Sequence, residues 1–135
     1  MGKIPTGTWV IVADGGKARM LHNVGGEGNA LSLKQDQVLD AQDMQVEGPS
    51  GHQPPETSGS YIDEATFAKQ LAHRLNAAAL KNEFSHIILV ADPQTLGQIR
   101  PQLHQEVTQR MVGELAKTFT NSPLSDIERA LQSDE

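Results

Sequence analysis

The chain has 135 residues, of which 37% are hydrophobic and 21% are charged, and it contains no cysteine. This length suits one domain with a core of its own, and the lack of cysteine excludes a disulfide framework, a thiol nucleophile and a thiolate metal site. The formal net charge is −6 and the 11 Lys and Arg residues form no cluster, which argues against broad nonspecific binding of nucleic acid. No apolar run approaches the roughly 20 residues of a membrane span, and no secretory signal is apparent, so we expect a cytoplasmic protein.

The first predicted elements are two strands joined by a tight turn. Residues 8–14 are rich in β-branched and aromatic side chains, and residues 17–24 form a second strand-like run. Asp14 and two glycines lie at the junction, and glycine supplies the positive φ that tight hairpin turns need. The pattern predicts an antiparallel hairpin at the start of the fold.

A third predicted strand spans residues 30–39 and follows a glycine-rich loop. We expect Leu31, Leu33 and Val38 on its buried side. Because short turns join the three strands, the sequence predicts an antiparallel meander. The third strand would be an edge to which another copy could pair, so the oligomeric state stays open.

The composition changes at about residues 42–60. Residues 47–60 contain almost no apolar side chain and many Pro, Gly and Ser residues, so they cannot bury enough surface to offset the entropy of ordering. We therefore expect one domain over residues 1–135 with a mobile polar loop at about 42–60. Loops of this length in compact domains are often functional, which makes this one a candidate surface for binding another protein.

A helix and a buried strand are predicted after the loop. Residues 61–82 carry one apolar stripe at helical spacing, and residues 86–92 form a continuous apolar run that favours a strand buried on both faces. A strand, a helix and a strand in this order imply a right-handed crossover, with the new strand parallel to the first. The stripe consists of Ala68, Leu71, Ala72, Leu75 and Ala79.

The last third of the chain alternates short predicted elements. We expect a helical turn at 96–100, a helix over 101–112, a strand over 115–120 and a final helix after residue 123. The element order β-β-β-α-β-α-β-α predicts an α/β fold with a mixed five-stranded sheet, as in ribonuclease-H-like and related domains. The last helix would bury Leu124, Ile127 and Leu131.

Four stretches of the chain, in this order and spacing, resemble the bacterial host attachment protein family: residues 9–19, 67–72, 87–93 and 96–100. That family is named for a part in attachment of bacteria to host cells. It is also similar to the middle domain of archaeal and eukaryotic peptide-chain release factors. The resemblance implies a fold like that middle domain and a partner in translation, the ribosome or tRNA.

The chain departs from those release factors at their Gly-Gly-Gln loop, which promotes hydrolysis of peptidyl-tRNA. Here Gly25 and Gly26 are followed by Glu27, and Gln98 follows a lone Gly97. The loop is therefore missing, and we do not expect direct peptide release.

Two acidic residues form the sharpest candidate site. Asp14 and Asp92 follow the two strands predicted to be parallel, so their carboxylates would share one edge of the sheet, outside which ligands tend to bind. Carboxylates there could hold Mg²⁺ for phosphodiester cleavage, with Asp63 or Glu64 as a third ligand. The alternative is structural, because Asp before glycine suits a hairpin and Asp92 before Pro93 suits a helix cap.

Three basic residues are candidates for contact with RNA phosphate: Lys17 and Arg19 on the hairpin, and Arg100 after the second parallel strand. The alternative for each is a solvated surface charge.

We favour a non-enzymatic binding protein without a cofactor, because no complete catalytic set is present. Its expected binding residues are Asp14, Lys17, Arg19, Asp92 and Arg100. The other reading is a Mg²⁺-dependent phosphoesterase or nuclease that uses Asp14 and Asp92.

Overall fold

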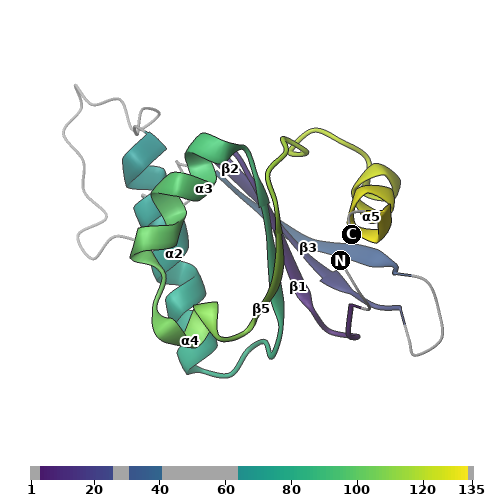
Figure 1. Ribbon diagram of the computed structural model, residues 1–135, viewed down its shortest axis with the longest axis horizontal. Coiled ribbons are helices and arrows are strands. Elements are labelled where there is room, and N and C mark those ends of the chain that lie inside the picture. Colours follow the sequence, from purple (N-terminus) through teal and green to yellow (C-terminus); the bar gives the residue numbers. More distant parts are fainter. Residues whose placement is uncertain (1–3, 26–30, 41–63, 134–135) are drawn as a thin grey trace.

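A computed structural model describes residues 4–25, 31–40 and 64–133. They form a five-stranded mixed sheet between helices (Figure 1), which confirms the predicted α/β fold. The predicted mobile loop at about 42–60 lies outside the described residues. The first elements are β1 (Trp9–Ala13), β2 (Lys17–Asn23), β3 (Leu33–Asp40), α2 (Glu64–Leu80) and β4 (Ile87–Ala91). The remaining elements are α3 (Pro93–Ile99), the 3₁₀ helix η2 (Arg100–Gln102), α4 (Gln105–Thr108), β5 (Met111–Leu115) and α5 (Leu124–Ser133).

The strand order in the sheet is β3-β2-β1-β4-β5. The first hairpin is antiparallel, with Ala13 opposite Ala18. β1 and β4 are parallel neighbours, in register from Trp9 opposite Ile87 to Ala13 opposite Ala91. This confirms the predicted parallel pairing, and it places Asp14 and Asp92 at the same edge of the sheet.

Two hydrophobic cores lie on the two faces of this sheet. In Figure 1, α2, α3 and α4 cover one face, and α5 lies over the other. Alternate residues of β1 pack into the two cores, with Ile11 on the α2 side and Val12 on the α5 side. The predicted stripe of α2 is fully buried, as are Ile127 and Leu131 of α5, so the apolar pattern of both helices predicted their packing.

The prediction for Val38 was wrong. Val38 is 41% exposed, whereas Leu39 is buried. A β-bulge leaves one extra residue in β3 and shifts the alternation of side chains by one residue, so that Val38 lies opposite Arg19 and on the same side of the sheet as Leu33. That part of the sheet borders an open cavity rather than the core, which leaves Val38 exposed.

The prediction of a helix over 101–112 was also wrong. The chain forms η2 and the one-turn helix α4, and then β5 extends from Met111 to Leu115. The residues at this helical spacing do face the core, since Val107 is buried and Leu103 and Met111 pack against the core. They lie in a link between η2 and α4, in α4 and in β5. The strand predicted at 115–120 therefore begins where β5 ends.

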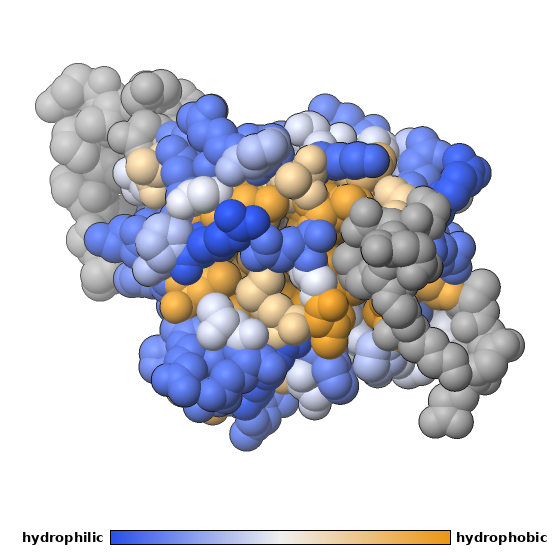
Figure 2. Space-filling view, in the orientation of Figure 1, coloured by the Kyte–Doolittle hydropathy of each residue, from blue (hydrophilic) through white to orange (hydrophobic). Residues whose placement is uncertain are grey.

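Both outer strands of the sheet carry a bulge. In β5 the register skips Val112, because Ile87 lies opposite Met111 and Ile88 opposite Gly113. Apolar residues gather in the middle of the face shown in Figure 2, where Figure 1 places β5. The side chain of Val112 in β5 is 38% exposed. Bulged edges disfavour pairing with another sheet.

None of the described helices has the length and apolar content needed to cross a membrane.

Candidate functional site

An open cavity of about 890 Å³ lies at the carboxyl ends of β1 and β4. Three of its lining residues are acidic, and none of the described ones is basic. We call it the carboxylate cavity. It is lined by Asp14, Gly15, Gly16, Glu64, Ala65, Asp92, Gln94, Thr95, Gln98 and Thr118.

Asp14 shapes the β1–β2 turn. Its Oδ1 accepts hydrogen bonds from the backbone N–H groups of Gly16 and Lys17, at 2.9 and 2.8 Å, which is a local turn motif typical of Asp. Its Oδ2 accepts a hydrogen bond from the Thr120 hydroxyl at 2.8 Å. Asp14 thus ties the hairpin to the segment that connects β5 to α5 (residues 116–123, the connecting segment).

Asp92 caps helix α3. Its Oδ2 accepts a hydrogen bond from the backbone N–H of Thr95 at 3.1 Å, and its Oδ1 accepts one from the Thr95 hydroxyl at 2.7 Å. Burial raises the pKa of the Asp92 carboxyl, but these hydrogen bonds outweigh burial and leave the pKa below its usual value. The helix-cap reading of Asp92 is confirmed.

Glu64 forms a further wall of the carboxylate cavity. It is the first residue of α2, and its Oε1 accepts a hydrogen bond from Gln94 Nε2 at 3.1 Å. A Cβ atom on Gly15 would come within 2.5 Å of the Glu64 Cδ atom, so the missing side chain of that glycine makes room for Glu64. Asp63, the other acidic candidate, lies outside the described residues.

Lys17 and Arg19 line a second, smaller cavity of about 270 Å³, with Thr120, Asn121 and Ser122 of the connecting segment on one side. We call it the basic cavity. Gln35 and Val38 of β3 complete its lining.

Arg19 holds the connecting segment in place. Its Nη1 donates to the backbone carbonyl oxygens of Phe119 and Ser122, at 3.2 and 2.6 Å, and its Nε donates to Gln35 Oε1 at 2.8 Å. Lys17 Nζ donates to Asn121 Oδ1 at 3.0 Å. Burial lowers the pKa of the Arg19 guanidinium.

Arg100 lines neither cavity. Its guanidinium pairs with the carboxylate of Glu114 on β5, with Nε 3.1 Å from Oε2. The hydrogen bond and the charge of Glu114 raise the pKa of Arg100. The structure thus brings Asp14, Asp92 and Glu64 to one cavity, places Lys17 and Arg19 at its neighbour, and separates Arg100 from both.

Three further residues at these cavities were missed from the sequence. Thr118 lines the carboxylate cavity, Thr120 bonds Asp14, and Gln98 has a buried Oε1 that finds no hydrogen-bond partner within the described parts of the chain. Thr120 is 106 residues from Asp14, and no local pattern indicates a contact at that distance.

The carboxylates suit Mg²⁺ in type, because Mg²⁺ takes oxygen ligands. Among residues 4–25, 31–40 and 64–133, no three His, Asp or Glu side chains come close enough together to hold one ion.

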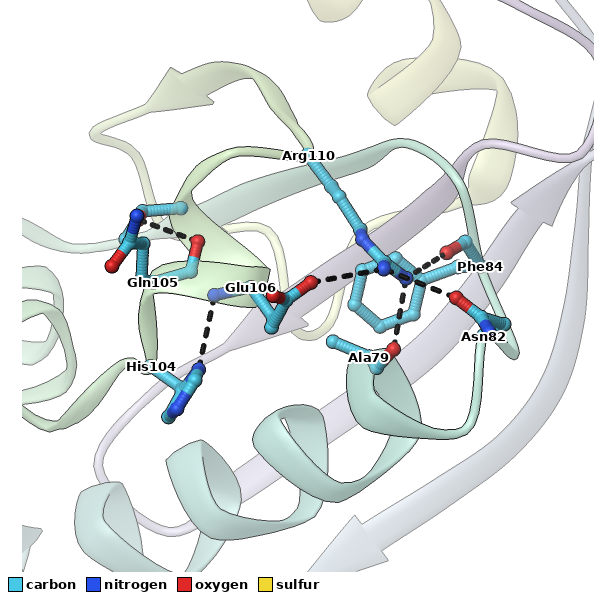
Figure 3. A network of polar contacts seen from close by, with 8 residues as sticks. Ala79, Asn82, Phe84, His104, Gln105, Glu106 and Arg110 are labelled. Carbon is cyan, nitrogen blue, oxygen red and sulfur yellow. Dashed lines mark hydrogen bonds and ion pairs between the residues drawn. The ribbon is translucent and has the colours of Figure 1, made fainter.

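The opposite end of the sheet carries a closed polar network around Arg110, which precedes β5 (Figure 3). Its Nη1 donates to the carbonyl oxygens of Ala79 and Phe84, each at 2.9 Å. Its Nη2 donates to Asn82 Oδ1 at 3.1 Å and to the Glu106 carboxylate at 3.2 Å. This arginine therefore closes the end of α2 and has a carboxylate as counter-ion.

The family model described as bacterial archaeo-eukaryotic release factor family 12 matches residues 7–131. This span contains all five strands and the described lining of both cavities. Among curated proteins, none matches the chain. The release-factor likeness predicted from the sequence is thus confirmed, while the match does not carry the host attachment name.

Proposed function

The chain belongs to bacterial archaeo-eukaryotic release factor family 12, and from this premise we propose that it is a non-enzymatic binding protein that acts in translation. The family match over residues 7–131 is the observation that carries the proposal. Its partner would be the ribosome or tRNA, and its compartment the cytoplasm. We also propose, on the basis of the four motifs of the sequence, that the chain is related to the host attachment proteins.

The contacts of the two aspartates give both of them a structural role. Both oxygens of Asp14 accept hydrogen bonds within the fold, and so do both oxygens of Asp92. A carboxylate has about four lone-pair sites, so these contacts leave each side chain able to accept further bonds. The shape of a turn and the cap of a helix nevertheless account for both residues without a catalytic role.

Co-sedimentation tests the proposal. Purified full-length protein is spun through a sucrose cushion with ribosomes, and a gel-shift assay measures binding to tRNA. We expect association with at least one of them at physiological salt. A chain that binds neither would overturn the translational role. A variant lacking residues 47–60 shows whether the polar loop supplies a protein contact of its own.

A Mg²⁺-dependent phosphoesterase or nuclease is the second candidate, because Asp14, Glu64 and Asp92 line one cavity. Incubation with RNA and millimolar Mg²⁺ tests it. Cleavage by the wild type that Asp92→Asn abolishes would reverse our preference, since Asn also caps helices well and the variant should keep its fold.

A further inference from the structure

We propose that the basic cavity binds a phosphate group. This inference deepens the proposed function and rests on it for the source of the phosphate, which would be RNA. The cavity lies between the β2–β3 hairpin and residues 120–122 of the connecting segment, beside the carboxylate cavity rather than in it.

The charges that line the two cavities favour the binding of an anion in the basic cavity. The described lining of the carboxylate cavity includes three carboxylates and no cation. The described lining of the basic cavity includes two cations and no carboxylate. Because the whole chain carries a formal charge of −6, a phosphate would be repelled from most of the surface and needs such a local reversal of sign.

Arg19 differs from three other arginines whose partners lie among the described residues. Arg100, Arg110 and Arg129 each contact a carboxylate. The hydrogen bonds of Arg19 in the described structure go to neutral oxygens: one side-chain amide and three backbone carbonyls. A partly buried cation without a counter-ion loses solvation that an anion can restore.

The guanidinium also has room for a ligand. Nε and Nη1 make all the hydrogen bonds that Arg19 forms with described residues, and none of those residues accepts a hydrogen bond from Nη2. A guanidinium presents its donors in a planar fork that matches phosphate oxygens.

The neighbouring amides add donors. Gln35 accepts the Arg19 hydrogen bond through Oε1, and Asn121 accepts the Lys17 hydrogen bond through Oδ1. Each amide therefore turns its oxygen to a cation and keeps its NH₂ group as a donor. The ammonium of Lys17 has three donors, of which one goes to Asn121. The cavity is rich in donors, as a phosphate requires.

Asp40 provides an internal check. It lies directly opposite Lys17 in the register of β2 and β3, and it takes part in contacts of its own. Residues directly opposite each other in an antiparallel pair have neighbouring side chains, so the negative charge of Asp40 should weaken the binding of an anion at Lys17. Asp40→Asn should therefore tighten phosphate binding, whereas loss of either cation should weaken it.

An NMR titration of the ¹⁵N-labelled full chain tests the site. Inorganic phosphate is added at constant ionic strength, with chloride as the reference anion. We expect the amide signals of Lys17, Asn121 and Ser122 to move, and Lys17→Gln to weaken the affinity by about threefold to tenfold, as for a charge-assisted hydrogen bond at a half-exposed site. Arg129→Gln, on the surface of α5, should leave the affinity unchanged.

Either of two results would overturn the inference: no movement of these signals, or equal affinity in Lys17→Gln and Arg129→Gln. Arg19→Gln is a second variant, and circular dichroism checks its fold. Competition with a short single-stranded RNA identifies the source. Displacement of phosphate supports an RNA backbone, whereas phosphate binding without displacement supports a small phosphate compound. In that second case the phosphate site stands, while the RNA part of the proposed function loses its support.

Discussion

Two arginines at opposite ends of the sheet make similar contacts with different outcomes. Arg110 donates to the carbonyls of Ala79 and Phe84 and pairs with Glu106 (Figure 3). Arg19 also donates to backbone carbonyls, but its described partners include no carboxylate. The charge of Arg110 is neutralised by a carboxylate within the fold. Arg19 also stabilises the fold, but its positive charge is not neutralised by a described residue and can attract an anionic ligand.

The closed end should be the more sensitive to mutation. Arg110→Met removes four hydrogen bonds, leaves Glu106 without its partner, and loses the contact with the Phe84 ring at 6.0 Å. We expect the free energy of unfolding to fall by about 2–3 kcal/mol, measured by urea denaturation. Glu106→Gln, which removes a half-exposed ion pair, should cost below about 1 kcal/mol. Equal losses in the two variants would contradict this account of the network.

Arg19→Met should destabilise less. It removes hydrogen bonds to carbonyls near the surface and leaves no described carboxylate without its partner. We therefore expect the free energy of unfolding to fall by about 1 kcal/mol. Hydrogen exchange should accelerate at residues 118–122, because Arg19 holds that segment. A loss as large as that of Arg110→Met would erase the contrast between the two ends.

Asp92→Ala tests the cap at the carboxylate cavity. Loss of the cap should lower the free energy of unfolding by about 1 kcal/mol at neutral pH. Because the folded-state pKa of Asp92 lies below its usual value, the wild type has this contribution above about pH 4, the unfolded pKa of Asp. It loses the contribution as the pH falls further, through the folded pKa. The difference between wild type and variant should therefore shrink in acid, whereas a constant difference would show that the charge of Asp92 plays no part.

The smallest effect is expected at the β1–β2 turn. Gly15→Ala would push a Cβ atom into the flexible end of Glu64, while Gly16→Ala meets no atom within 4 Å. We expect stability changes below about 0.5 kcal/mol in both, as for surface substitutions. In NMR spectra the side-chain amide of Gln94, which bonds Glu64, should shift in Gly15→Ala alone. The same shift in both variants would contradict the close approach of Gly15 and Glu64.

The same contrast shows what the sequence could predict. The parallel pairing of β1 with β4 followed from one buried run and a crossover helix, and it placed Asp14 and Asp92 at one edge. The turn and cap chemistry of both aspartates was also readable locally. These features depend on neighbours in sequence or on a fixed handedness.

The role of Arg19 could not be predicted in this way. Its partners Phe119, Thr120 and Ser122 lie about a hundred residues away, in a segment expected to be a strand up to residue 120. The failure at Val38 has a related cause, since its exposure depends on how residues 120–122 cover that part of the sheet and not on the pattern of β3 alone. Periodicity along one segment does not predict the contacts that distant segments make across the sheet.

Hydrogen exchange measured by mass spectrometry, with and without ribosomes or tRNA, shows whether a translational partner binds at the basic cavity. We expect slower exchange on addition of the partner at residues 15–19 and 118–122, with residues 79–84 and 104–110 unchanged. Protection confined to the Arg110 end, or no protection by either partner, would contradict this expectation.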